Sequence, residues 1–170
     1  MNVLVPVDNS ANSLRALRRV AEEFARHPGK ALEVQLLNVR PAFSRHIARF
    51  MKQRQLDAYQ QAEAERALRP ARKLLEQHGI AFTTHVETGR TAEVIAGAAR
   101  RLACDHIVMG TSRKNSLLRM IEDSVTNKVM ELASVPVEVV PGSPLSKLYR
   151  YGIPAVIGAA LGLMLLAAAD

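Results

Sequence analysis

Strands and helices alternate along this chain, and the stretch from Cys104 to Pro141 shows the pattern most clearly. It opens with a short, mainly apolar run, Asp105 to Met109, that stops at Gly110. A polar, basic loop follows, then apolar residues at helical spacing from Val125 to Ala133, and then a second apolar run from Val135 to Val140. This order predicts a βαβ unit whose two strands are parallel and joined by a right-handed crossover. In open α/β sheets, ligands bind at the loops that follow the carboxyl ends of such strands.

The same alternation runs through the chain from its first residues. Val3 to Val7 is an almost unbroken apolar run, as expected of a central strand that is covered on both faces. The expected strands cover residues 3–7, 32–39, 80–86, 105–109 and 135–140, and the expected helices cover residues 14–24, 56–74, 94–102 and 122–133. This pattern predicts an α/β fold with a five-stranded, doubly wound parallel sheet and helices on both faces.

Several positions within these elements carry specific expectations. Pro70 lies inside the second helical pattern and should bend it, because proline removes one backbone hydrogen bond and crowds the preceding turn. The alternating run from Ile80 to Val86 indicates a strand at a sheet edge with one exposed face. Thr91 is expected to cap the helix that follows it. Cys104, the only cysteine, precedes a buried strand and is expected to be a small core residue.

Two stretches of this sequence resemble the universal stress protein family. The first, Val3 to Ser10, looks like the first strand of the family and the Asp-Gly-Ser turn that follows it. The second begins at Met109, where nucleotide-binding members have Met-Gly at the end of a strand and then Gly-x2-Gly-x9-Gly-Ser/Thr. Aligned without gaps, the motif falls on Gly110, Arg113, Asp123 and Ser124. The first glycine and the serine are kept, the other two glycines are replaced, and the resemblance covers about the first 141 residues.

The resemblance implies an adenine-nucleotide pocket at the carboxyl ends of the strands. It implies the flavodoxin-like strand order 3-2-1-4-5, which brings Asp8 and Gly110 to one crevice. In the family, the aspartate after the first strand and a backbone group at the end of the second strand hold the nucleoside. These carry over to Asp8 and Val39. The residues that the resemblance assigns to a nucleotide are Pro6, Asp8, Val39, Met109, Gly110, Arg113, Ser124 and Val125.

The phosphate half of this motif is altered. Glycines allow the loop backbone to approach phosphates closely, and two of them are missing here. Arg113 stands at one such position, where its guanidinium could grip a phosphate or fill the place of one. Asp123 stands at the other, where a carboxylate at a helix start repels a second anion. Three alternatives therefore stay open: ATP bound as in the family, a smaller or less charged adenine ligand, and a pocket filled by its own side chains.

Composition and motif content disfavour several other functions. The histidines, at positions 27, 46, 78, 85 and 106, show no metal-ligand spacing, so no metal site is expected. No nucleophile elbow, Walker A loop or carboxylate pair is present, and we expect a protein that is not an enzyme and has no catalytic residues. The net charge of +7 suits an anionic partner. However, the basic segment Arg45 to Arg54 lacks a groove-reading motif, so nucleic acid is not expected.

The end of the chain departs from the family pattern. Residues 142–152 form a basic linker with Lys147 and Arg150, and Ile153 to Ala169 then runs without a polar residue. As a helix this run spans roughly 26 Å, slightly less than the ~30 Å hydrocarbon core of a bilayer. Positive charge just before it predicts a tail anchor that keeps the folded domain, residues 1–141, in the cytoplasm. A terminal helix buried in an oligomer is the alternative.

The expected protein is a stress-response regulator or sensor, tethered to the membrane, with an adenine-nucleotide pocket whose phosphate loop is degenerate. The resemblance adds a homodimer formed through the strand Val135 to Val140, an edge that needs cover. Two other functions stay open: a ligand-free module that docks on a membrane partner protein, and a true ATP-binding switch.

Overall fold

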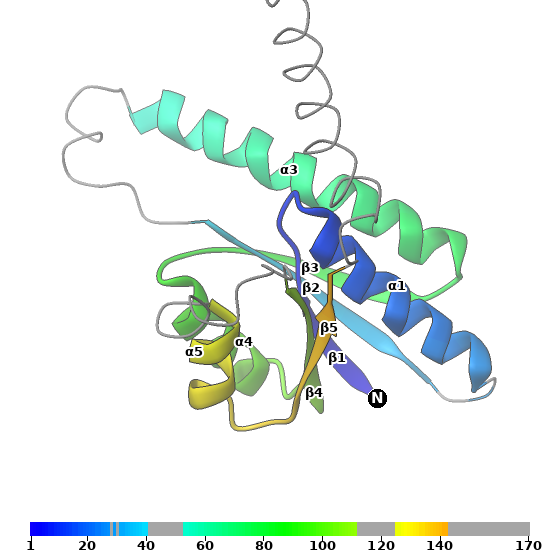
Figure 1. The fold of residues 1–170 in the computed structure, drawn as a ribbon. Helices are drawn as coiled ribbons and strands as arrows, with labels where there is room; N and C mark the ends of the chain where they lie inside the picture. The colour runs from blue at the N-terminus through cyan, green and yellow to red at the C-terminus, as the bar shows by residue number, and fades with distance from the viewer. Residues whose placement is uncertain (28, 30, 41–52, 112–124, 143–170) are drawn as a thin grey trace, which may run out of the picture.

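The computed structural model describes residues 1–27, 29, 31–40, 53–111 and 125–142. Within these residues the elements are β1 (Asn2–Pro6), α1 (Ala11–Arg26), β2 (Glu33–Arg40), α3 (Gln53–Gln77), β3 (Ala81–Thr88), α4 (Thr91–Arg101), β4 (His106–Thr111), α5 (Val125–Leu132) and β5 (Val137–Pro141). The strands form one parallel sheet in the order β3-β2-β1-β4-β5. Figure 1 shows α1 and α3 on one face of this sheet and α4 and α5 on the other. The predicted α/β fold and strand order are confirmed.

Strand β1 lies at the centre of the sheet, and its side chains alternate between two cores. Val3 and Val5 are fully buried on the side of α1 and α3, in a cluster with Leu17 of α1. Leu4 lies between them in the sequence and is fully buried on the other side, in a cluster with Ile95 of α4. Successive residues of a strand point to opposite faces, so a strand covered by helices on both sides needs an unbroken apolar run.

The outer strands of the sheet are β3 and β5. Strand β3 pairs with β2 along its whole length, for example His85 with Leu37, and its first residues alternate between exposed and half-buried. This confirms the edge strand predicted from the alternation between Ile80 and Val86. At the other end of the sheet, β5 pairs with β4, where Val139 lies opposite Met109. Strand β5 is therefore the second edge.

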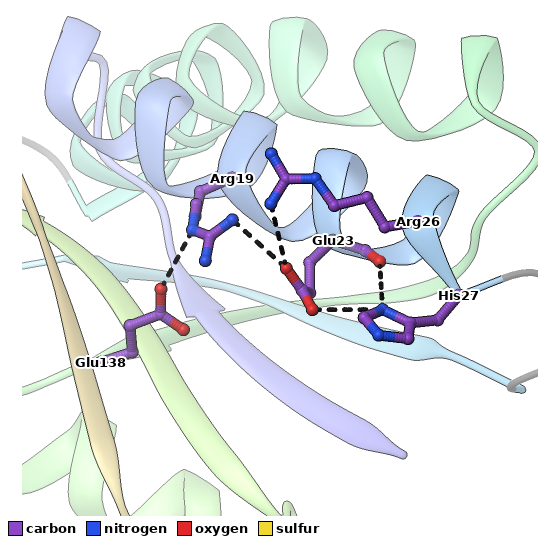
Figure 2. A network of polar contacts seen from close by, with 5 residues as sticks. All are labelled: Arg19, Glu23, Arg26, His27 and Glu138. Atoms are coloured by element: carbon purple, nitrogen blue, oxygen red, sulfur yellow. Dashed lines mark hydrogen bonds and ion pairs between the residues drawn. The ribbon is translucent and has the colours of Figure 1, made fainter.

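A cluster of charged side chains joins α1 to the edge strand β5 (Figure 2). Arg19 lies between two carboxylates, with its Nη1 3.3 Å from Glu23 Oε2 and its Nε 3.4 Å from Glu138 Oε1. Glu23 also pairs with Arg26 and His27 at the end of the same helix. These side chains are between 39% and 61% exposed, so each pair contributes only about 0–1 kcal/mol to stability. The network thus links β5 to α1 through a single exposed pair and adds little to the stability of the fold.

The local expectations have different outcomes. The N-cap of α4 is Arg90, whose side chain makes no capping hydrogen bond, so the prediction that Thr91 caps this helix is wrong. Only two residues separate the end of β3 at Thr88 from α4, which begins at Thr91, three residues before the expected helix at 94–102. Cys104 is 4% exposed, which confirms it as a core residue. Helix α3 continues through Pro70, and the bend there stays a prediction.

The apolar segment at the end of the chain lies outside the described residues. Ile153 to Ala169 and all of the basic linker except Gly142 belong to this part. Within the residues that the structure describes, no helix combines the length and the apolar character needed to cross a membrane. The tail anchor therefore stays a prediction from the sequence.

Candidate functional site

The carboxyl end of β1 leads directly into the turn that starts α1. After Pro6 and Val7 the chain reaches Asp8, whose Oδ1 accepts hydrogen bonds from the Ser10 backbone N–H at 3.2 Å and from the Ser10 hydroxyl at 2.5 Å. The Ser10 Oγ accepts in turn from the N–H of Ser13, which makes Ser10 the N-cap of α1. Short polar side chains that bond to the nearby backbone favour such a turn. The turn therefore fixes the Asp8 carboxylate at the end of the sheet.

The Asp8 carboxyl is held in its charged form. Partial burial raises its pKa, but hydrogen bonds from Ser10 and Ser13 outweigh burial, and the resulting pKa lies below the ordinary value of 3.8. An ionised carboxylate only accepts hydrogen bonds. At neutral pH, Asp8 is therefore suited to the hydroxyl or amino groups of a ligand and unsuited to an anionic group.

Asn38 joins the ends of β1 and β2 beside this turn. Asn38 is 8% exposed, and its side-chain Nδ2 donates a hydrogen bond to the Val7 carbonyl oxygen at 2.8 Å. The Val7 N–H donates to the Leu37 carbonyl oxygen, also at 2.8 Å. Both backbone polar groups of Val7 are thus satisfied by β2. Asn38 helps to fix the chain one residue before Asp8.

Gly110, near the end of β4, packs against the first turn of α1. A Cβ atom on Gly110 would lie 2.1 Å from the Asn12 carbonyl oxygen, 2.4 Å from the Asn12 carbonyl carbon and 3.1 Å from the Ser13 nitrogen. These are backbone atoms, so they cannot move aside as the end of a flexible side chain can. In the family motif, glycines allow the loop backbone to approach phosphates closely. The structure shows that Gly110 is also required for helix packing, with or without a ligand.

The carboxyl ends of β1, β2 and β4 and the amino-terminal parts of α4 and α5 surround a cavity of about 160 Å³. Its wall contains most of the residues that the sequence assigned to a nucleotide: Pro6, Asp8, Val39, Met109, Gly110 and Val125. The other two, Arg113 and Ser124, lie outside the described residues, as does Asp123. Ordinary ligand pockets measure about 300–1,000 Å³. The space within the described wall is therefore large enough for only part of a nucleotide, and the binding roles of these residues stay a prediction.

The cavity wall also contains residues that the sequence analysis did not assign to a site: Val7, Ser13, Leu37, Thr91, Ile95 and Thr126. Thr91 and Ile95 are one helical turn apart and lie on one side of α4. Helix α4 connects the edge strand β3 to β4, so it passes over β2 and β1 and its amino end meets their carboxyl ends. With the predicted strand order, the path of this helix from β3 to β4 across the sheet would have placed both positions beside the carboxyl ends of β1 and β2.

The described wall of this cavity is mainly apolar and carries one charged side chain, the Asp8 carboxylate. Ser13, Thr91 and Thr126 contribute hydroxyl-bearing residues. An apolar slot suits a flat, uncharged ring, and the carboxylate and hydroxyls suit polar groups attached to that ring. Because no cation belongs to the described wall, the cavity alone does not neutralise a phosphate.

A larger hollow, of about 280 Å³, lies at the opposite end of the sheet, beside Met1 and His106. Its charged residues include Arg19, Glu23 and Glu138, which form the network of Figure 2. Arg19 already has a carboxylate partner on each side, so the wall offers a ligand mostly groups that are engaged with one another. This hollow is therefore not the better candidate for a ligand site, although it is larger. At the smaller cavity, the Asp8 carboxylate and its turn lie together with the amino-terminal parts of α4 and α5.

Comparison with known proteins agrees with the resemblance. Residues 1–141 match the model of the universal stress protein family. Universal stress protein MJ0531 of Methanocaldococcus jannaschii is 28% identical to this chain over 148 residues, which cover 81% of this chain and 80% of that protein.

Solved structures show the same fold. The hypothetical protein MJ0577 matches with a TM-score of 0.68 at 28% identity, over 85% of this chain and 97% of that chain. A universal stress protein family protein from Arabidopsis thaliana, solved with AMP bound, matches with a TM-score of 0.62 at 18% identity, over 84% of this chain and 92% of that chain. Because the family model spans residues 1–141 of the 170, this chain belongs to the universal stress protein family.

Proposed function

We propose that this protein is a stress-response regulator that binds an adenine nucleoside or nucleotide at the carboxyl end of its sheet. The observation that carries this proposal is the cavity, because six of the residues that the family resemblance assigns to a nucleotide meet in its wall. The Arabidopsis protein of the same fold was solved with AMP, which supports the same class of ligand here. The apolar wall would hold the adenine ring, and Asp8 would accept hydrogen bonds from the ribose hydroxyls.

The protein acts by binding rather than by catalysis. Asp8 is the one ionisable side chain on the described wall of the cavity, and its lowered pKa makes it a poor general base near neutral pH. The hydroxyl of Ser13 donates to the backbone carbonyl oxygens of Asp8, at 2.7 Å, and Ser10, at 3.0 Å, so it is committed to the turn. Ser13 therefore stabilises the turn, and the Asp8 carboxylate can accept hydrogen bonds from a bound ligand.

Calorimetric titration of the full-length protein with adenosine, AMP and ATP tests this function. Adenosine is expected to bind, and Asp8→Asn is expected to weaken it about tenfold, because a charged acceptor is lost. Glu76→Gln is the matched control, since it removes a carboxylate from an exposed position on α3, and it should bind like the wild type. A folded protein that gives no binding heat with any of the three ligands refutes the proposal.

One second candidate function is a ligand-free module that docks on a membrane partner protein. The small volume of the cavity, about 160 Å³, favours it, because side chains already occupy much of the space between strands and helices. This function predicts that Asp8→Asn and cavity-filling substitutions such as Thr91→Leu leave partner recruitment unchanged. A ligand-dependent regulator predicts that they alter it.

The membrane tether is a further part of the proposal, and the sequence supports it. Ile153 to Ala169 contains no charged residue, whereas Lys147 and Arg150 precede it. Full-length protein is expected in the membrane fraction and is released by detergent, while a chain that ends at Ser146 stays in the supernatant. The positive charge before the apolar segment favours an orientation in which the folded domain faces the cytoplasm. Full-length protein in the soluble fraction without detergent would overturn the tether.

The same proposal includes a homodimer that forms through β5. Among the strands that the structure describes, β5 is the last in the sheet order, so one of its sides pairs with none of them. Edge strands of this kind need cover, and a second copy of the chain supplies it. Light scattering of the detergent-solubilised protein, corrected for detergent mass, should give twice the chain mass of 18.6 kDa. A mass of one chain at micromolar concentration excludes this dimer.

A further inference from the structure

A second hollow lies beside the candidate cavity, between the amino end of α4 and one side of α5. Its volume is about 210 Å³, larger than the cavity itself. Thr91 and Val125 belong to the walls of both, so the two spaces are immediate neighbours. Val125 is 41% exposed and Leu132, which also lines the hollow, is 44% exposed, although both are apolar residues of α5. A ligand that outgrows the cavity can therefore extend between the two helices.

The two neighbouring spaces differ in charge. The described wall of the cavity carries the Asp8 carboxylate and no cation, so it repels an anionic group. The wall of the hollow carries two cations, Arg90 and Lys128, and one carboxylate, Glu93. The hollow is thus the place next to the cavity where the described residues supply positive charge.

The cation Arg90 is able to change partner. Its Nη1 lies 2.7 Å from Glu93 Oε1, but the two side chains are 84% and 54% exposed, and an exposed pair of this kind contributes little. Arg90 is also the N-cap of α4 without using its side chain as a cap, so the guanidinium is not required there by the helix. A phosphate offers such a guanidinium a doubly charged partner with matching geometry.

We propose that this hollow binds the phosphate group of an adenosine phosphate whose base lies in the cavity, with Arg90 and Lys128 as the cations that hold it. The assignment rests on the proposed function, because it needs the base in the cavity. It places the phosphate between α4 and α5. The altered Gly-rich motif between Gly110 and Ser124 is then not needed for phosphate binding.

Calorimetry with adenosine and AMP on four forms of the full-length protein tests this assignment. The wild type is expected to bind AMP about tenfold more tightly than adenosine, because the phosphate of AMP adds charged contacts to Arg90 and Lys128. In Arg90→Gln/Lys128→Gln the affinity for AMP should fall to within about twofold of that for adenosine, while adenosine binding stays unchanged. Arg69→Gln/Lys73→Gln removes the same charge from exposed positions on α3, on the other face of the sheet, and should keep the preference for AMP. Arg113→Gln should keep it as well.

Each other result has a definite meaning. Loss of the AMP preference in Arg113→Gln alone moves the phosphate to the motif and overturns the assignment. Equal binding of adenosine and AMP by the wild type also overturns it, yet leaves the proposed function standing. Absence of binding by either ligand overturns both. A thermal melt of each variant, monitored by circular dichroism, verifies that the exposed substitutions leave the fold intact.

Discussion

Gly110→Ala tests whether the end of β4 is shaped by helix packing. The added methyl carbon would lie 2.1 Å from the Asn12 carbonyl oxygen and 2.4 Å from the Asn12 carbonyl carbon, so α1 must move away from the sheet. That movement disturbs the hydrogen bond from the Ser13 hydroxyl to the Asp8 carbonyl oxygen, now 2.7 Å. Overpacking of a core costs about 1–3 kcal/mol, and the upper value applies because backbone atoms are met. For a chain of this length, 3 kcal/mol lowers Tm by about 6–12 °C.

The matched control for this substitution is Gly97→Ala in the middle of α4. Apart from its chain neighbours and the backbone of its own helix, no described atom lies within 4 Å of a Cβ on Gly97. Alanine favours a helix interior by about 0.5–1 kcal/mol, so Tm should stay or rise. Both variants are compared with the wild type by circular dichroism at 222 nm and by urea unfolding. A Gly110→Ala protein as stable as the wild type would refute the packing argument. Ligand binding would then be the remaining reason for a glycine at position 110.

Three more substitutions or titrations test the site and its surroundings. Asn38→Leu leaves the buried Val7 carbonyl without its donor and should lower the unfolding free energy in urea by about 1–3 kcal/mol; an unchanged midpoint would contradict this. The folded pKa of Asp8 is lowered, so its stabilising contribution is present above its unfolded pKa of about 3.9 and is lost as pH falls through the folded value. NMR titration should give a midpoint below 3.8, and Asp8→Asn should reduce the loss of stability in acid; a midpoint at or above 3.8 would be inconsistent with the hydrogen-bonded turn. Arg19→Gln breaks the exposed link to Glu138 and should change the unfolding free energy by less than about 1 kcal/mol; a larger loss would make the network of Figure 2 a main support of β5.

The fold was predictable because its signals are local and repeated. The apolar run Val3 to Val7 is readable without knowledge of any partner, and it indicates a strand buried on both faces. The alternation from Ile80 to Val86 likewise marked the edge strand β3. The strand order depended on the family resemblance as well. Once that order is set, Asp8, Val39 and Gly110 have to meet at one end of the sheet.

The features that escaped prediction depend on contacts between segments far apart in the sequence. The approach of Asn12 to Gly110 joins α1 to β4, and the bond from Asn38 to Val7 joins β2 to β1. Neither contact leaves a periodic trace in the sequence. The wrong prediction for Thr91 has a similar origin, because a threonine just before a helical pattern is a good N-cap when the rest of the fold is not considered. In the structure, Thr91 is instead the first residue of α4 and belongs to the cavity wall.

The altered motif acquires a simpler meaning when these long-range contacts are considered. The first glycine, Gly110, is the one that α1 requires, and it is kept. Arg113 and Asp123, which stand in place of the other two glycines, lie outside the described residues. Packing against α1 is therefore sufficient to account for Gly110, whatever the loop after it binds. In the proposed site, the carboxylate lies in the cavity and the two cations lie in the adjoining hollow, so substitutions can change binding of the adenosine half and of the phosphate half separately.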